Sequence, residues 1–108
     1  MHPRAPVSAL VRAVPDAFLR CLRTGPVAPD VARARAQHDA YVAALRRLGV
    51  EVVVLPADEA HPDCCFVEDT AVLVDGLAVI TRPGAPSRLG ECDAIAAALA
   101  PRIEAARM

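Results

Sequence analysis

An apolar run in the middle of this chain limits what the chain can fold into. Val50–Leu55 is apolar except for Glu51, is rich in β-branched residues, and lies between Gly49 and Pro56. Gly commonly follows the end of a helix, and Pro stops a strand. A continuously apolar run of this length is typical of a strand that is buried on both faces, as in sheets that helices cover. We therefore expect an α/β fold.

The segment before this run predicts a helix. Asp30 is a favourable helix-capping residue, and the residues after it recur at spacings of three and four, which is the period of one helix face. These residues are Ala34, His38, Tyr41, Leu45 and Leu48. Upstream, Ser8–Val14 predicts a first strand that Pro15 closes, and Phe18–Pro29 predicts an irregular loop.

The second half predicts a hairpin, a helix and the start of another strand. Cys65–Val74 and Leu77–Thr81 are strand-like runs, and Asp75-Gly76 between them supplies the positive φ angles of a tight turn. A helix is expected from about Arg88 to Ala100, and a strand from Arg102. Two successive strand-and-helix units would leave strand edges unpaired. We therefore expect self-association through these edges, or partial order.

The composition of the chain limits the classes of molecule that it can be expected to bind. The 108 residues suffice for one modest domain, and the formal net charge of -1 gives no field that would attract nucleic acid. All 12 basic residues are Arg, so a Schiff-base lysine or a phosphate-binding Walker lysine is excluded. No run is long enough to span a membrane, and no signal peptide is recognisable. The 4 Cys include no C-x-x-C pair, so we expect thiols, a cytoplasmic location, and neither a cofactor nor a metal.

Charged residues near the predicted strand ends indicate a small-molecule site. Asp63, Glu68 and Asp69 supply three carboxylates, and Arg88 follows the second strand run. A guanidinium needs carboxylates in matching geometry, and an α-carboxylate is well bound by Arg, so this polarity suits an arginine-like ligand. Adjacent strand residues point to opposite faces, so the strand must bend or end between Glu68 and Asp69. Glu59 lies outside this cluster and is expected to be solvated.

The same stretches carry a resemblance to a known family. They are similar to the N-terminal part of dimethylarginine dimethylaminohydrolase, a guanidine-modifying enzyme of the pentein superfamily, and the similarity runs from about Ala9 to Glu104. The stretches that resemble it most are Asp63–Thr70, Ile80–Arg88, Ala36–His38 and Tyr41–Val42.

The resemblance implies roles for five residues. Asp63, Glu68 and Asp69 match substrate-binding positions, with Asp69 the best candidate for the guanidinium itself. Arg88 matches the arginine that holds the amino-acid end of the substrate. Leu22 falls where a lid loop of the family offers a backbone contact.

The resemblance also implies a fold and a reaction. Penteins are propellers of five α/β units, of which residues 1–108 would supply about two as a single, partial domain. The family cleaves dimethylarginine to citrulline and an alkylamine. Its nucleophilic Cys and catalytic His lie in a portion that this chain does not contain, so we assign no catalytic residue here and expect the chain alone to be inactive.

Three alternatives stay open. The chain could be an inactive module that binds an arginine-like ligand, or a relative of arginine deiminase. It could also be a small redox or metal protein that uses Cys64 and Cys65 with His61 and Asp63. Zinc sites normally separate paired cysteines by two to four residues, and consecutive cysteines on a strand point apart. Small buried apolar side chains are therefore the better interpretation of Cys64 and Cys65.

Overall fold

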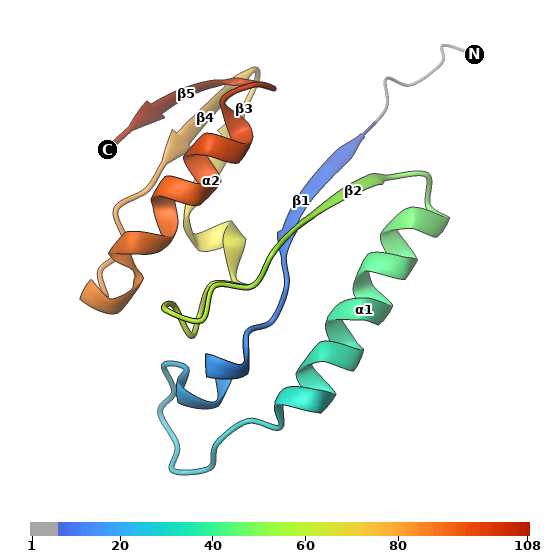
Figure 1. Ribbon diagram of the computed structural model, residues 1–108. Coiled ribbons are helices and arrows are strands. Elements are labelled where there is room, and N and C mark those ends of the chain that lie inside the picture. The colour runs from blue at the N-terminus through green and yellow to red at the C-terminus, as the bar shows by residue number, and fades with distance from the viewer. Residues whose placement is uncertain (1–6) are drawn as a thin grey trace. The chain divides into compact units, whose positions relative to one another are not determined.

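Each half of the chain is built around a strand–helix–strand connection. The computed structural model describes residues 7–108, which divide into unit 1, ending at Cys65, and unit 2, Phe66–Met108 (Figure 1). Whether residues 1–108 form one domain, as expected, stays a prediction. Within residues 7–108, the structure contains no helix that is both long enough and apolar enough to cross a membrane.

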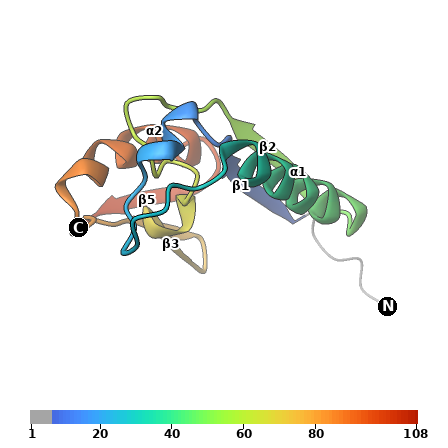
Figure 2. The same cartoon turned by 90° about the horizontal axis from the view of Figure 1, so that it is seen from below.

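Unit 1 consists of two parallel strands and a crossover helix. Strand β1 (Ser8–Arg12) pairs with β2 (Glu51–Leu55), with Ser8 opposite Glu51. Helix α1 (Val31–Arg47) connects them and packs on β2, and Figure 2 shows it lying along the strand pair. A short 3-10 helix, Asp16–Arg20, follows β1, so part of the expected irregular loop is ordered.

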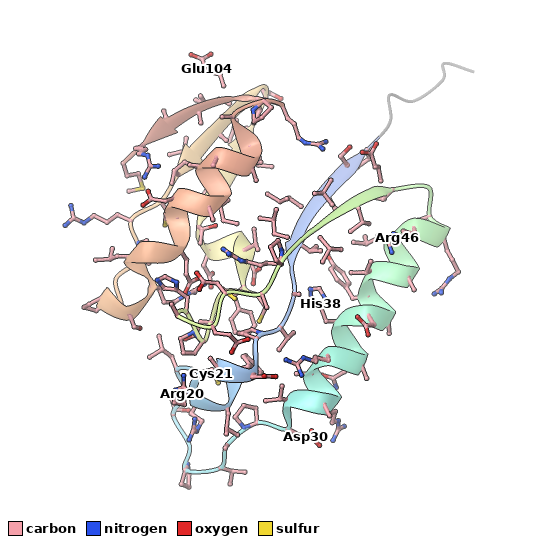
Figure 3. The ribbon with its side chains drawn as sticks, in the orientation of Figure 1. Arg20, Cys21, Asp30, His38, Arg46 and Glu104 are labelled. Carbon is pink, nitrogen blue, oxygen red and sulfur yellow. The ribbon has the colours of Figure 1, made fainter. Side chains whose placement is uncertain are left out.

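Helix α1 begins and ends where its sequence predicts. The Asp30 carboxylate accepts the Arg33 N–H at 3.1 Å, which satisfies one of the amides left open at the helix start (Figure 3). Gly49 follows the helix at a φ of 84°, a left-handed conformation that favours glycine. The expected apolar stripe is only partly right, because Val42 is the buried residue of the helix while Tyr41 and Leu48 are exposed.

The expectation that β2 is buried on both faces is wrong. Glu51 and Val54 are exposed, and the remaining β2 residues are half-buried. The reason is that β2 pairs only with β1 among the described residues, and α1 is the helix of this unit that packs on it. The apolar run thus has partners for only part of its surface.

Unit 2 is a three-stranded sheet with one helix. Strand β3 (Ala71–Val74) runs antiparallel to β4 (Leu77–Ile80), and β4 is parallel to β5 (Glu104–Arg107). Helix α2 (Cys92–Leu99) is the crossover from β4 to β5 and packs on both strands. The fully buried apolar residues of this unit come from β4 and α2, and they are Ala78, Ile80, Cys92, Ile95 and Leu99.

The Asp75-Gly76 hairpin is confirmed, since both residues have positive φ angles, 34° and 81°. The expected strand from Cys65 is wrong: Val67–Asp69 is a 3-10 turn, and β3 begins only at Ala71. Thr70 explains the break, because its hydroxyl and its N–H both donate to the Val67 carbonyl, at 2.6 and 2.9 Å, which offers the backbone a local alternative to the ladder.

The expected helix from Arg88 also begins later. Pro86–Glu91 forms a 3-10 helix, and α2 starts at Cys92. Gly90 lies within this 3-10 helix, where its backbone freedom disfavours a regular first α-turn.

We expect Gly49→Ala to lower the free energy of unfolding by about 1 kcal/mol, because an L-residue is strained at this φ. No neighbouring atom lies within 4 Å of a Cβ at this position, so the loss of stability reports the backbone strain and not a steric clash. Gly25→Ala is the matched control, since its Cβ also meets nothing within 4 Å and its φ is not in the left-handed region. Urea denaturation of both variants measures the difference, and equal stabilities would contradict this interpretation.

Candidate functional site

Two of the predicted site residues, Asp63 and Leu22, meet in unit 1. The Asp63 side chain is buried, with 5% of its surface exposed, and its two carboxylate oxygens accept the Leu22 N–H at 3.2 and 3.3 Å. Leu22 itself is exposed and directly follows Cys21, which Figure 3 labels beside Arg20 at the end of the 3-10 helix. Asp63 therefore fixes the start of the loop that leads to α1.

The loop that carries Asp63 has further polar anchors, which sequence reasoning missed. The Glu59 carboxylate accepts the N–H groups of Asp16 and Ala17 at 2.9 and 2.8 Å, so it caps the 3-10 helix. Glu59 is exposed in this loop, as expected for a solvated carboxylate, but it also has these two backbone partners. Arg12, at the end of β1, donates from Nε to the Pro56 carbonyl at 2.9 Å. No local pattern in the sequence signals these contacts, because the partners are more than forty residues apart.

Asp58 lies at the centre of a small charged cluster in the same loop. Its Oδ2 lies 2.6 Å from Nδ1 of His61 and 3.8 Å from Nη2 of Arg12. The hydrogen bond from His61 is the main cause that lowers the pKa of Asp58, and it outweighs the opposing effect of burial. The ionised carboxylate therefore links β1 to the loop.

In unit 2 the structure brings Arg88 and Asp69 together. Arg88 Nη1 donates to Asp69 Oδ2 at 2.6 Å, and Nη2 donates to the Phe66 carbonyl at 3.0 Å. The Arg88 side chain is 10% exposed, whereas that of Asp69 is 54% exposed. The buried guanidinium of Arg88 thus holds the carboxylate of Asp69, which is itself exposed to solvent.

Glu91 is the residue of this cluster that sequence reasoning missed. It is 1% exposed and accepts from Arg88 Nε at 3.0 Å and from Nη2 at 2.7 Å, a two-pronged ion pair. Glu91, and after it Asp69, raise the pKa of Arg88, whose charge is therefore permanent. The spacing of three residues between Arg88 and Glu91 was the available signal, because such pairs face each other on a helical turn.

Glu68 and Asp69 lie on the 3-10 turn Val67–Asp69 that precedes β3, so the expected strand that bends or ends between them is replaced by a turn. Both are exposed. Asp69 has Arg88 as a partner, and Glu68 projects from the same turn without belonging to the ion-pair cluster. Of the five predicted residues, Asp63 thus meets Leu22 within unit 1, and Asp69 meets Arg88 within unit 2.

The cysteines lie apart from a recognisable reactive centre. Cys21, Cys64, Cys65 and Cys92 are present as thiols. Cys64 is 2% exposed and donates to the carbonyls of Ala13 and Asp58 at 3.9 and 3.7 Å, which agrees with its interpretation as a small buried side chain. Burial raises the pKa of Cys92 and disfavours its thiolate. Among residues 7–108, no three His, Cys, Asp or Glu side chains are grouped so as to hold a metal ion.

Structural comparison defines the class of protein. Over 94% of this chain and 41% of the other, the fold matches a cysteine-to-serine variant of dimethylarginine dimethylaminohydrolase from Pseudomonas aeruginosa complexed with citrulline, with a TM-score of 0.90 and 34% identity. The N-terminal domain of a cyanobacterial arginine dihydrolase shares the fold at 15% identity, with a TM-score of 0.80 over 96% of this chain and 40% of that domain. The chain therefore has the mixed α/β fold of pentein structures.

Sequence comparison identifies the family within this class. Residues 13–102 match the family model described as N,N dimethylarginine dimethylhydrolase, eukaryotic, and the chain belongs to this family. It is 49% identical over 67 residues to the dimethylarginine dimethylaminohydrolase of Pseudomonas aeruginosa, which covers 62% of this chain and 26% of that protein. The Streptomyces coelicolor relative is 49% identical over 65 residues, 59% of this chain and 25% of its own length. These two alignments each cover about a quarter of the relative, and the structural match covers 41% of the Pseudomonas aeruginosa chain, so this chain spans less than half of it.

We expect the Asp58 cluster to make unfolding depend on pH. The pKa of Asp58 is lowered in the folded chain, so its stabilisation is fully present above the ordinary carboxyl pKa and is lost as the pH falls through the lowered value. Asp58→Asn should cost about 1–2 kcal/mol at neutral pH, the usual worth of a hydrogen bond to a charged group. This cost should fade as the pH falls through the lowered pKa of Asp58, because the carboxyl group is then protonated.

Thermal unfolding from pH 7 downwards, compared with Asp39→Asn on the exposed face of α1, measures this effect. If the cost of Asp58→Asn stayed constant over the whole pH range, the ionised Asp58 would not be the stabilising species.

Proposed function

We propose that this chain forms the substrate-binding N-terminal part of a hydrolase that cleaves methylated arginine to citrulline and an alkylamine. The observation that carries the proposal is the match of nearly the whole chain to a dimethylarginine dimethylaminohydrolase that was complexed with citrulline. The cluster around Arg88 adds support from this chain itself, because it holds a solvent-facing carboxylate in one geometry.

In this proposal Asp69 accepts the guanidinium of the substrate. A solvent-facing carboxylate whose partner is a buried arginine is already oriented before a ligand arrives, which reduces the entropy cost of binding. Glu68, on the same turn, adds a second negative charge near a cationic ligand. By its sequence match alone, Asp63 is also proposed as a substrate-binding residue. Leu22 would contribute its backbone carbonyl, because its N–H already donates to Asp63.

Arg88 has two tasks in this proposal. Sequence similarity assigns it to the amino-acid end of the substrate, where a guanidinium binds a carboxylate. Its contacts with Asp69 and Glu91 give it a further role in orienting Asp69. Glu91 accepts from Nε and Nη2, so these two contacts would hold the guanidinium while Nη1, which donates to Asp69, interacts with a ligand.

The bond-making groups would lie outside residues 1–108. In the family mechanism a Cys thiolate attacks the guanidinium carbon, a His protonates the departing amine, and water then releases citrulline from the covalent intermediate. The residues of this chain would position the substrate and stabilise the charge of its guanidinium. The buried Cys64, which donates to two carbonyls, is unsuited to act as the nucleophile.

We expect the purified chain to form no citrulline from dimethylarginine, because no nucleophile and acid pair is assembled on it. A colorimetric citrulline assay over hours at high protein concentration measures this. Turnover that Cys64→Ser abolishes would overturn the expectation and make Cys64 a catalyst. Saturable binding of dimethylarginine without turnover, measured by calorimetry, would favour the alternative of a binding module.

We expect Asp69→Asn to lower kcat/KM about a hundredfold in a chimera in which this chain replaces the matched part of the Pseudomonas aeruginosa enzyme. In the complex the substrate would exclude water from Asp69, and breaking a charge pair desolvated in this way costs about 3 kcal/mol, where each 1.4 kcal/mol is about tenfold. Asp75→Asn is the matched control, since Asp75 lies in the exposed hairpin turn and Asn tolerates its positive φ.

Thermal unfolding of both chimeras separates loss of activity from loss of fold. If the two variants keep kcat/KM within about threefold of the parent, less than ~1 kcal/mol, Asp69 does not bind the guanidinium.

A further inference from the structure

The charged side chains around Arg88 do not balance one another. Two carboxylates bind the single guanidinium, Asp69 at 2.6 Å and Glu91 at 2.7 Å, so one positive charge against two negative charges leaves one negative charge in excess. Glu68, on the same 3-10 turn as Asp69, adds another. A simple ion pair would be neutral, so the excess negative charge is a distinct property of this cluster.

The two carboxylates that share Arg88 differ in their exposure to solvent. The Glu91 side chain is 2% exposed, and each of its oxygens accepts from Arg88, at 3.0 and 2.7 Å. The Asp69 side chain is 54% exposed, and its Oδ2 accepts from Arg88. Within the described range 7–108, Oδ1 of Asp69 accepts no hydrogen bond. The negative charge in excess is therefore accessible to a ligand at Asp69.

Glu91 decides how much of the positive charge on Arg88 is left for Asp69. A buried guanidinium requires a negative counter-charge. If position 91 were neutral, Asp69 would be the carboxylate that supplies this counter-charge, and the Arg88–Asp69 pair would be neutral as a whole. Because Glu91 matches the charge of Arg88 in the interior, Asp69 can attract a second cation. Charges this close to one another are only weakly screened where water is excluded.

We propose that Glu91 sets the preference of this site for a cationic guanidino ligand over a neutral ureido ligand of similar shape. The inference rests on the function proposed above, in which dimethylarginine is the substrate and citrulline the product. Both ligands have the same amino-acid end, but a guanidinium is charged and a ureido group is not. The charge of Glu91 strengthens the binding of dimethylarginine and leaves that of citrulline almost unchanged. Glu91 thereby favours release of the product.

A purely structural role for Glu91 leads to a different expectation. If Glu91 only held Arg88 in place, its loss would disturb the contact of Arg88 with the amino-acid end, which the two ligands share. Both ligands would then bind more weakly by the same factor. The preference ratio, defined as the Kd of citrulline divided by the Kd of dimethylarginine, therefore separates the effect of charge from an effect on structure.

Calorimetry measures the preference ratio in the chimera described above. The chimera carries the cysteine-to-serine substitution of the solved Pseudomonas aeruginosa structure, which removes the proposed nucleophile so that dimethylarginine stays intact. Glu91→Gln keeps the shape of the side chain and removes its charge, and it should lower the preference ratio about tenfold. Glu91→Asp restores the charge, and it should keep the ratio within about threefold of that of the parent.

Asp93→Asn is the matched control. Asp93 lies close to Glu91 in the sequence, its side chain is 81% exposed, and it forms an ion pair with Arg107 at 3.0 Å. Solvent screens an exposed pair of this kind, so the preference ratio should stay within about twofold of that of the parent.

Thermal unfolding shows whether each variant folds. If Glu91→Gln does not fold, the double variant Arg88→Met and Glu91→Met replaces the buried pair by apolar side chains, which is often neutral for stability. This variant loses one charge of each sign, so the excess negative charge is unchanged. Both ligands should bind more weakly, and the preference ratio should stay within about threefold of that of the parent. A tenfold fall in this variant would contradict the proposed role of charge.

The same measurements show which results overturn the inference. Equal weakening of both ligands in Glu91→Gln assigns Glu91 a structural role, and an unchanged ratio means that its charge does not act on the ligand. Asp69→Asn in the same assay tests the proposed function itself. If it leaves both Kd values unchanged, the substrate assignment fails and the inference fails with it. If it lowers the ratio and Glu91→Gln does not, only the role of Glu91 fails.

Discussion

The buried guanidinium of Arg88 is the interaction on which unit 2 depends most. A permanently charged group that is almost fully enclosed needs hydrogen-bond partners, and Glu91, Asp69 and the Phe66 carbonyl accept from its three nitrogens. Asp69 and Glu91 lie in the 3-10 segments that precede β3 and α2, and Phe66 directly precedes the first of them. One side chain therefore ties the entry of the hairpin to the entry of the helix. The candidate ligand-binding carboxylate of Asp69 is part of the same interaction.

In unit 1, several separate contacts hold the loop after β2 in place. Its loop after β2 has no regular structure over most of its length, so side chains hold it in place. Arg12 binds its start, Glu59 caps the 3-10 helix from its middle, and Asp63 holds Leu22 near its end. Asp63 thus lies in a loop that is held by three contacts, each between residues far apart in the sequence. The proposed ligand carboxylates of the two units rest on different physical supports.

The comparisons place the chain in the family described as N,N dimethylarginine dimethylhydrolase, and the aligned residues cover about a quarter of the two sequence relatives described. In the function proposed above, this chain supplies the positioning groups and other parts of the whole protein supply the reacting groups. Within this chain, Asp63, Asp69 and Arg88 are the candidate positioning groups whose contacts the structure describes.

Local chemistry in the sequence determined the helix cap at Asp30, the left-handed Gly49 and the Asp75-Gly76 turn, because each depends on conformational preferences of one or two residues. It also determined the order of strands and helices, and it indicated the family. The tertiary structure alone decided that β2 is half-exposed, that Glu59 caps a distant helix, and that Arg88 and Glu91, whose spacing indicates a pair, are buried together. The physical reason is that burial and ion pairing depend on which distant segments come together. The periodicity of apolar residues along the sequence does not show which distant segments come together.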